Sequence, residues 1–308
     1  MRLHLRWLVP LLLACVLAAG GVYWFYRTRS LARPSDLVSL LPAANASVVY
    51  IDVTAMRHSG ILNMVAGSKA VEDADYQQFV NETKFDYRQD LDALAGAFKD
   101  GKVYFAVRGR FHWKNLQDYA ARQGGSCHGN FCVIAGSQPS RRISFYPLKS
   151  DVLAMAVGPD DFAAYQVAAQ SGKPALTVTA PKEPVWAVIP ASALQQMDSL
   201  PAAAKAYVPA LLGAEQIVFG IGADSSNQLQ LSVQVTCKDA SAASALLAQF
   251  DATTKALREL LARRRQKPDP ADLSAVLVAG SFRSDQRQVY GAWPIPKAFV
   301  DAIAGATY

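Results

Sequence analysis

The sequence predicts an α+β protein, with an N-terminal transmembrane helix followed by a two-part body in which helices pack on antiparallel sheets. Three observations lead to this class: an uncharged stretch near the start, many short segments rich in β-branched residues, and amphipathic stretches between them. The predicted parts are an anchor with its flanks at 1–33, a tether at 34–47, a first half at 48–173, a joint at 174–184 and a second half at 185–308.

The predicted anchor is the uncharged stretch 7–26. Twenty helical residues span about 30 Å, the thickness of a hydrocarbon core. Three interpretations stay open: an uncleaved signal-anchor, which we prefer because the apolar run is long, a signal peptide cleaved near 18–20, and a lipoprotein modified at Cys15. Aromatic rings favour the headgroup level, so the predicted membrane-interface residues are Trp7 at one end and Tyr23, Trp24 and Tyr26 at the other.

The side of the membrane follows from two further features. Arginines flank the stretch on both sides, so the positive-inside count is close to a tie. A short charged start followed by an apolar run is typical of secretory signals, and a predicted disulfide is typical of oxidising compartments. We therefore expect a single-pass protein of the inner (plasma) membrane whose body is extracytoplasmic, in the periplasm.

The charge balance argues against a nucleic-acid partner. Five of the 31 basic residues lie in residues 1–33, which contain no acidic residue. The rest of the chain has 26 basic and 25 acidic residues and is close to neutral. A nucleic-acid-binding body would carry a basic surface, and this one has no such excess.

Apolar periodicity predicts the elements of the first half. The strand at 48–53 precedes a helix through Ile61 and Val65, and a second helix is expected at 75–98. A continuous apolar strand at 103–107 is followed by a helix at 113–122 that ends at the glycine pair 124–125. The remaining predictions are strands at 131–135, 143–146 and 152–157 and a helix at 159–172.

The second half repeats part of this pattern. It starts with a strand at 185–189 and a helix, and continues with strands at 217–221 and 229–235, the latter alternating apolar with polar residues. Asp239 is expected to cap the longest helix. Both halves run from strand to helix to buried strand, although over 55 and 32 residues, so the sequence predicts a diverged structural repeat. The last predictions are strands at 276–278, 281–282 and 289–293 and a helix at 297–303.

Cys127 and Cys132 form the sharpest local feature. The turn dipeptide Gly129-Asn130 lies between them, and a hairpin there brings the two thiols within disulfide reach. A redox or metal pair is the alternative, but the spacing is neither C-x-x-C nor part of a four-ligand set. We predict a structural disulfide, and we interpret Cys237 as a buried free thiol.

No catalytic, cofactor-binding or metal-ligating residues are predicted, and no cofactor is expected. The histidines are isolated and are interpreted as solvated. Asp86 and Asp90, four residues apart, suit acid–base chemistry, but carboxylates near helix starts more often cap free amides. The stretch 220–222 lacks the third glycine of a phosphate-binding loop.

Three stretches carry a resemblance to a known family. They are 84–92 (Lys-Phe-Asp-Tyr-Arg-Gln-Asp-Leu-Asp), 108–111 with Leu116, Tyr119, Ala120 and Gly124, and the strand at 185–189 with its later long helix. In these the chain resembles uncharacterised, membrane-anchored bacterial α+β proteins. That family has no established activity, so the resemblance implies the architecture and transfers no functional residue.

Three functional hypotheses remain. The first is a non-enzymatic protein, held in the membrane by its N-terminal helix, whose body binds a partner protein or an envelope component. The second is binding of an apolar ligand or lipid between sheet and helices, which needs a cavity of about 300 Å³ or more. The third is a hydrolase with dispersed carboxylates, which needs a pocket that gathers two carboxylates, or one with His112 or His128.

Overall fold

The computed structural model describes residues 34–66, 74–136, 138, 141–169, 180–194, 211, 213–224 and 228–305. The predicted anchor, with Trp7, Cys15, Tyr23, Trp24 and Tyr26, lies outside these residues. Within the described ranges, no helix combines the length and apolar character needed to cross a bilayer.

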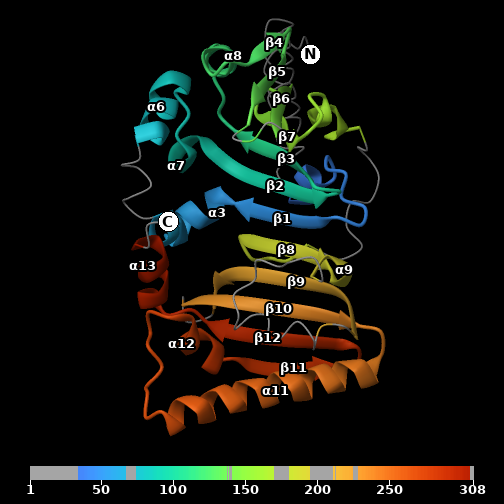
Figure 1. The fold of residues 1–308 in the computed structure, drawn as a ribbon, viewed down its shortest axis with the longest axis vertical. Helices are drawn as coiled ribbons and strands as arrows, with labels where there is room; N and C mark the ends of the chain where they lie inside the picture. The colour runs from blue at the N-terminus through green and yellow to red at the C-terminus, as the bar shows by residue number, and fades with distance from the viewer. Residues whose placement is uncertain are drawn as a thin grey trace, which may run out of the picture.

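A twelve-stranded antiparallel sheet forms the centre of the structure (Figure 1). Its strand order is β11-β12-β10-β9-β8-β1-β2-β3-β7-β6-β5-β4. The prediction of an α+β fold with a large antiparallel sheet and helices is confirmed. The strands are β1 (Ser47–Asp52), β2 (Leu91–Lys99), β3 (Lys102–Gly109), β4 (Ser126–His128), β5 (Phe131–Ala135), β6 (Arg142–Lys149), β7 (Val152–Gly158), β8 (Val185–Pro190), β9 (Ala214–Ala223), β10 (Leu229–Cys237), β11 (Ser281–Asp285) and β12 (Gln288–Pro294).

The two halves of the chain meet at the centre of this sheet. Strands β1 and β8 pair antiparallel, with Val48 opposite Val188 and Ile51 opposite Val185. Outward from this join, the first half runs β1-β2-β3-β7-β6 and the second runs β8-β9-β10-β12-β11. Each half thus places three sequential strands side by side and then a hairpin in reversed order. The hairpin of β4 and β5 extends the first half at its outer edge.

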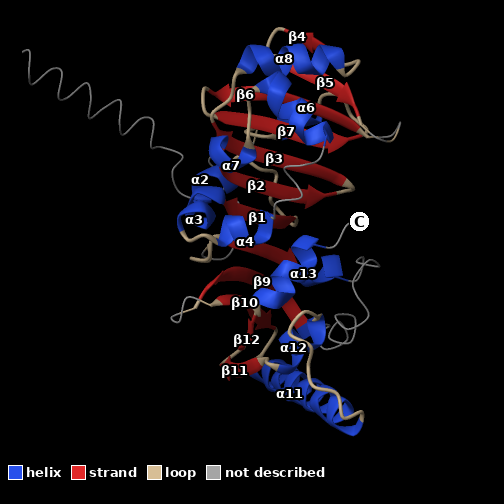
Figure 2. Cartoon of the chain, turned by 90° about the vertical axis from the view of Figure 1, so that its left-hand side faces the viewer, coloured by secondary structure: helices blue, strands red, loops and turns tan. Residues whose placement is uncertain are grey.

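Most helices cover one face of the sheet, which we call the helix face. Figure 2 shows α4, α6, α8 and α13 in front of the strands. On the other face, called the opposite face, α2 and η2 cover the first half. The helices are α2 (Pro34–Val38), α3 (Val53–His58), α4 (Ile61–Ala66), α6 (Ala74–Thr83), α7 (Tyr87–Asp90), α8 (Trp113–Arg122), the 3-10 helix η2 (Ala163–Gln166), α9 (Ala191–Leu194), α11 (Ala240–Arg263), α12 (Leu273–Val278) and α13 (Lys297–Gly305).

Apolar side chains fill the layer between the sheet and the helices on its helix face. The longest helix, α11, buries Leu246 and Phe250 against Ile217, which is fully buried on β9. Asp239 caps this helix as predicted, since its side chain accepts a hydrogen bond from the Ala242 N–H. Helix α8 makes a similar layer with β3, β5, β6 and β7 in the first half.

Residues 34–47, expected to act as a tether, belong to the folded body. They form α2 and a following turn in which Leu37, Val38 and Leu41 are at most 2% exposed. Prolines at 34 and 42 suggested a linker, but the apolar residues between them pack on the opposite face of the sheet. Burial of three apolar side chains outweighs the local preference of the prolines for an extended tether.

The helix predicted at 75–98 is wrong in its second part. Helix α6 ends at Thr83, Lys84 takes a left-handed conformation (φ 59°), and residues from Leu91 onward form β2. Alanines favour a helix locally. In the structure, Ala93, Ala95 and Ala97 are each fully buried on the opposite face, and β2 pairs with β1 and β3. Tertiary pairing therefore overrides the helical propensity.

Two shorter predictions are also corrected. The strand expected at 276–278 is part of α12, whose N-cap Asp272 accepts hydrogen bonds from Ser274 N–H and Ala275 N–H. This cap signal lies in the sequence and outweighs the β-branched residues that favoured a strand. Of the helix expected at 159–172, the described part contains only the short 3-10 helix η2.

Candidate binding site

The opposite face of the second half contains a hollow of about 860 Å³, which we call the sheet hollow. It lies over β9, β10, β12 and β11, and the segment before β8 closes one side. Its volume falls within the range of small-molecule sites, roughly 300–1,000 Å³. The described polar residues that line it are Glu183, Ser232, Gln234, Thr236, Ser281, Arg283, Gln288 and Tyr290.

The pairing register brings these side chains to one face. Gln234 on β10 lies opposite Val218 on β9 and Tyr290 on β12, and Tyr290 lies opposite Arg283 on β11. Side chains alternate between the two faces of a strand, so residues two apart on each strand also line the hollow. The alternation of polar and apolar residues in 229–235 is therefore the sequence signal for this surface.

Glu183 reaches the hollow across two glycines of β9. A Cβ added to Gly220 would lie 2.9 Å from Glu183 Cδ and 2.6 Å from Ser232 Oγ, and one added to Gly222 would lie 3.2 Å from Glu183 Cγ. Any side chain at Gly220 would thus displace the Ser232 hydroxyl and the Glu183 carboxylate. The stretch 220–222, which did not fit a phosphate-binding loop, makes room for Glu183 above the sheet.

Hydrogen bonds order the polar groups of the hollow. Ser232 Oγ donates to Glu183 Oε1 at 3.1 Å, or alternatively to the Gly220 carbonyl at 3.3 Å. Gln288 Oε1 accepts from Gln234 Nε2 at 3.1 Å and from the Tyr290 hydroxyl. The Arg283 guanidinium carbon lies 3.9 Å from the centre of the Tyr290 ring, a cation–π contact. The polar groups thus form two sets, Glu183 with Ser232 and the Gln234–Gln288–Tyr290 set with Arg283.

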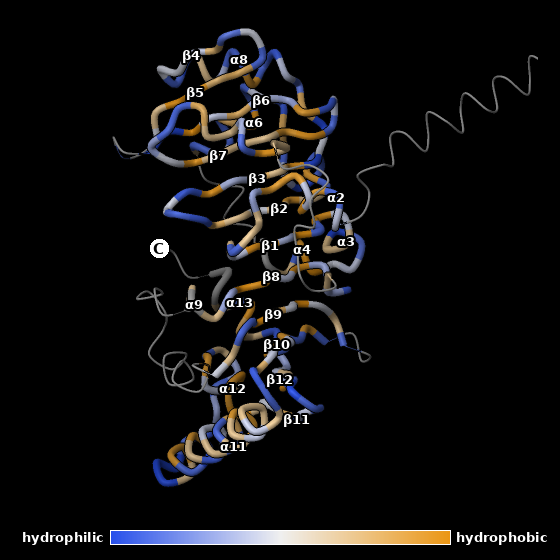
Figure 3. The backbone as a smooth tube through the Cα atoms, turned by 90° about the vertical axis from the view of Figure 1, so that its right-hand side faces the viewer, coloured by the Kyte–Doolittle hydropathy of each residue, from blue (hydrophilic) through white to orange (hydrophobic). Residues whose placement is uncertain are grey.

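The same face has the opposite character in the first half of the sheet. There Tyr50, Ala95, Ala106 and Ala154 are buried under α2 and η2. In the second half, the described helices that contact β9–β12 lie on the helix face, and Figure 3 shows hydrophilic stretches in β11 and β12. One continuous sheet face therefore changes from a covered apolar core to a hollow lined by polar groups.

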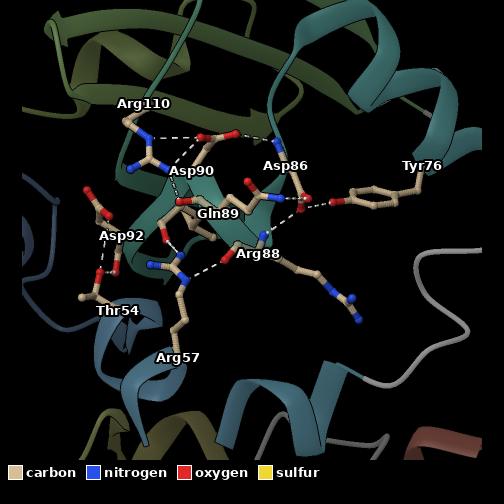
Figure 4. A network of polar contacts seen from close by, with 10 residues as sticks. Thr54, Arg57, Tyr76, Asp86, Arg88, Gln89, Asp90, Asp92 and Arg110 are labelled. Carbon is tan, nitrogen blue, oxygen red and sulfur yellow. Dashed lines mark hydrogen bonds and ion pairs between the residues drawn. The ribbon is translucent and has the colours of Figure 1, made fainter. Parts of the chain in front are cut away.

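The acidic cluster around Asp86 is a structural network at the start of β2 (Figure 4). Asp86 caps α7 by accepting from Arg88 N–H at 2.9 Å, and it also accepts from the Tyr76 hydroxyl at 2.8 Å. Burial, followed by this bond to Asp86, raises the pKa of Tyr76. Asp90 accepts from Asp86 N–H at 2.9 Å. These contacts agree with the predicted capping role.

Two arginines complete the network in Figure 4. Arg110 pairs with Asp90 at 3.0 Å and donates to the Gln89 carbonyl. Arg57 donates to the carbonyls of Arg88 at 2.6 Å and Leu91 at 2.8 Å. The network joins α3, α7, β2 and the end of β3, so the 84–92 stretch serves to shape the corner where α7 leads into β2.

The cysteines lie as the sequence predicted. Cys127 and Cys132 face each other in the β4–β5 hairpin and form a disulfide, with Cα atoms 4.1 Å apart. Cys237 is a buried free thiol at the end of β10, 1% exposed, and burial raises its pKa. The described histidines, His58, His112 and His128, are exposed.

The hydrolase hypothesis gains little from the described residues. Their His, Cys, Asp and Glu side chains form no group of three that could hold a metal ion. Within the described lining of the sheet hollow, Glu183 is the sole carboxylate. A smaller hollow of about 370 Å³ near the β6–β7 turn has neither a carboxylate nor a histidine among its described residues.

Sequence reasoning missed Glu183, Arg283 and Tyr290 as candidate site residues. Each lies 49 or more residues from Ser232 along the chain, and strand pairing brings them to the same face. The alternating pattern of β10 pointed to an exposed sheet face, but it did not indicate which strands would extend that face.

Fold and hollow together define a class: an α+β protein with one long antiparallel sheet, which among the described residues is covered by helices on one face and bears the sheet hollow on the other. No protein-family model matches the chain, and no curated protein matches it. The chain is similar in fold to a solved structure described as crystal form III of TP0453, with a TM-score of 0.51 and 9% identity over 88% of this chain and 98% of that one. Crystal form IV of TP0453 has a TM-score of 0.45, with 9% identity over 88% and 97%. This likeness shows the fold alone.

Proposed function

We propose that the chain is a non-enzymatic binding protein of the cell envelope, tethered to the inner membrane by its N-terminal stretch, that captures a partner protein or an envelope component in the sheet hollow. The observation that carries the proposal is the hollow itself. Six of its polar side chains are half-buried, and several are ordered by mutual hydrogen bonds. Convergent polar groups in a concave surface are typical of binding sites.

Two features support the envelope location. The uncharged stretch 7–26 has the length of a membrane span. The Cys127–Cys132 disulfide is of a type that persists in oxidising compartments. The periplasm is such a compartment, and the proposed orientation places the body there.

Location is tested with a membrane-impermeant thiol reagent applied to intact cells whose outer membrane has been permeabilised. We expect Cys127 and Cys132 to react only after an impermeant reductant has been added, because they lie on the periplasmic side and are paired. Reaction only after the inner membrane is lysed would place the body in the cytoplasm and contradict the proposal.

Binding is tested by photo-crosslinking in the cells that make the protein. A photoreactive amino acid replaces Arg283, which is exposed at the hollow. The matched control carries it at Leu260, which is 44% exposed on α11. We expect a discrete adduct from position 283 that is absent from position 260. Equal labelling at both positions, or none at 283, would refute capture in the hollow.

A further inference from the structure

The chemistry of the lining narrows the ligand class. We propose that the sheet hollow binds a saccharide, an uncharged chain of polyhydroxylated rings, as the recognised part of the envelope component. This inference rests on the proposed function and goes further by naming the class of ligand.

The charges of the lining balance. Glu183 is the single carboxylate and Arg283 the single guanidinium among the described lining residues. A phosphate-rich ligand would call for several cations, and a cationic ligand for several carboxylates. The rest of the body is close to neutral as well. A ligand without net charge matches this surface.

The hydrogen-bonding groups match hydroxyls. Ser232, Thr236 and Tyr290 carry hydroxyls that both donate and accept, and the amides of Gln234 and Gln288 offer both functions. A sugar hydroxyl also donates and accepts at once. The hydrogen bonds within the hollow use one carboxylate oxygen of Glu183 and the amide oxygen of Gln288. The second carboxylate oxygen of Glu183 can accept further hydrogen bonds, and the amide nitrogen of Gln288 can donate them.

Small apolar surfaces lie between the polar groups. Val218, Ala292 and the ring of Tyr290 line the hollow beside the amides. Sugar rings present C–H groups as well as hydroxyls, and the apolar side chains of Val218 and Ala292 offer them a surface to pack on. A lipid chain would require a mainly apolar wall, which this lining does not provide.

The position of the hollow argues against an extended peptide. A peptide strand binds by adding to the edge of a sheet, where backbone groups are available. The hollow instead lies on the face of β9, β10, β12 and the edge strand β11, and its polar lining consists of side chains on that face. Its volume of about 860 Å³ suits an oligosaccharide of a few rings.

The test uses the full-length chain in detergent micelles and isothermal titration calorimetry. The probes are chitotetraose and maltotetraose, with inorganic phosphate and a medium-chain fatty acid as contrasting classes. We expect saturable binding of at least one oligosaccharide and of neither contrasting probe.

Two pairs of variants locate the binding. Glu183→Gln removes the charge from the acceptor, and Gly220→Ala displaces Glu183 and the Ser232 hydroxyl without removing either. Each should weaken saccharide binding by about tenfold, because hydrogen bonds to a charged group are the stronger ones. The matched controls are Glu259→Gln on the exposed side of α11 and Gly213→Ala, whose added Cβ would lie 3.8 Å from Ala242 Cβ. They should bind as the natural chain does.

Three results would overturn the inference: no oligosaccharide binding at millimolar concentrations, binding of phosphate or fatty acid instead, or saccharide binding that both hollow variants leave unchanged. Crosslinking at position 283 separates the two proposals. An adduct with a protein, together with silent calorimetry, would retain capture in the hollow and reject the saccharide. Failure of both measurements would reject both.

Discussion

Trp186→Ala is expected to destabilise the whole sheet, because this side chain lies where the two halves join. Trp186 on β8 is 1% exposed, and its ring stacks on Tyr50 of β1 with centroids 5.3 Å apart. The two residues are direct partners in the β1–β8 pair, and Gly220 of β9 lies on the other side of Trp186. Truncation therefore removes the stacked ring pair across the join.

The magnitude follows from the buried surface. A tryptophan buries up to about 250 Å², and replacement by alanine removes roughly 150 Å² of apolar contact. At about 25 cal/mol per Å² this costs about 4 kcal/mol, within the range of roughly 3–5 kcal/mol for such truncations. Trp186 Nε1 is buried without a hydrogen-bond partner among the described residues. Trp186→Phe removes that donor and keeps a ring, so we expect a change under about 1 kcal/mol.

The assay is denaturant unfolding of the full-length chain in detergent micelles, followed by circular dichroism at 222 nm. Leu260→Ala on α11 is the control, since its side chain is 44% exposed, and its free energy of unfolding should change by no more than about 0.5 kcal/mol. Alkylation of Cys237 reports on the second half and reduction of the Cys127–Cys132 disulfide on the first. A loss below about 1 kcal/mol for Trp186→Ala, or probes that report separate transitions in the natural chain, would refute the idea of one continuous core.

Two further predictions concern the first half. Replacing both Cys127 and Cys132 with alanine should lower the free energy of unfolding by about 2 kcal/mol, because a disulfide that closes a short loop, with a sequence separation of 5, gives a modest entropic gain. Amide hydrogen exchange should increase in the β4–β5 hairpin. Unchanged exchange there would contradict this explanation. Burial, followed by the charge of Asp52, raises the pKa of Tyr50 to about 12, so its contribution to stability is complete below pH 10 and is lost as the pH rises from about 10 towards 12. Tyr50→Phe should therefore flatten the alkaline loss of stability in that window, and an identical pH profile for variant and natural chain would show that the ring is not buried in solution.

Local patterns in the sequence predicted much of the fold. The apolar strands at 103–107, 185–189 and 217–221, the helix at 113–122 and the cap at Asp239 are all present. Each of these signals depends on residues within a few positions of one another. The Cys127–Cys132 hairpin is of the same kind, because a two-residue turn fixes its geometry.

Two of the errors arose where distant partners decide the structure, whereas the one at 276–278 overlooked the local cap at Asp272. The alternating alanines of β2 lie in a helix-favouring composition, yet small side chains are what fit beneath α2. Residues 34–47 showed linker prolines, yet Leu37 and Leu41 are buried by strands that follow later in the chain. The elements that bury these residues lie elsewhere in the chain, so a short window of sequence does not reveal them.

The candidate site was the least predictable part. Alternation in 229–235 indicated that β10 has a polar face. The role of Glu183 depends on the two glycines of β9, and the role of Arg283 depends on its pairing opposite Tyr290. Glu183 also bonds to Ser232 at a sequence separation of 49, and the Arg283–Tyr290 pair adds to the same face only through the pairing of β12 with β10, so no local motif marked the site.

The sequence by itself determined the uncharged N-terminal stretch, the neutral body, the disulfide hairpin and the two-faced character of the strands, because each depends on composition or on spacing along a single segment. The tertiary structure alone decided that the two halves share one sheet and that its opposite face is apolar under α2 and η2 but polar over β9–β12. The physical reason is that a strand's pattern sets which side chains share a face, whereas strand order and register set which faces meet.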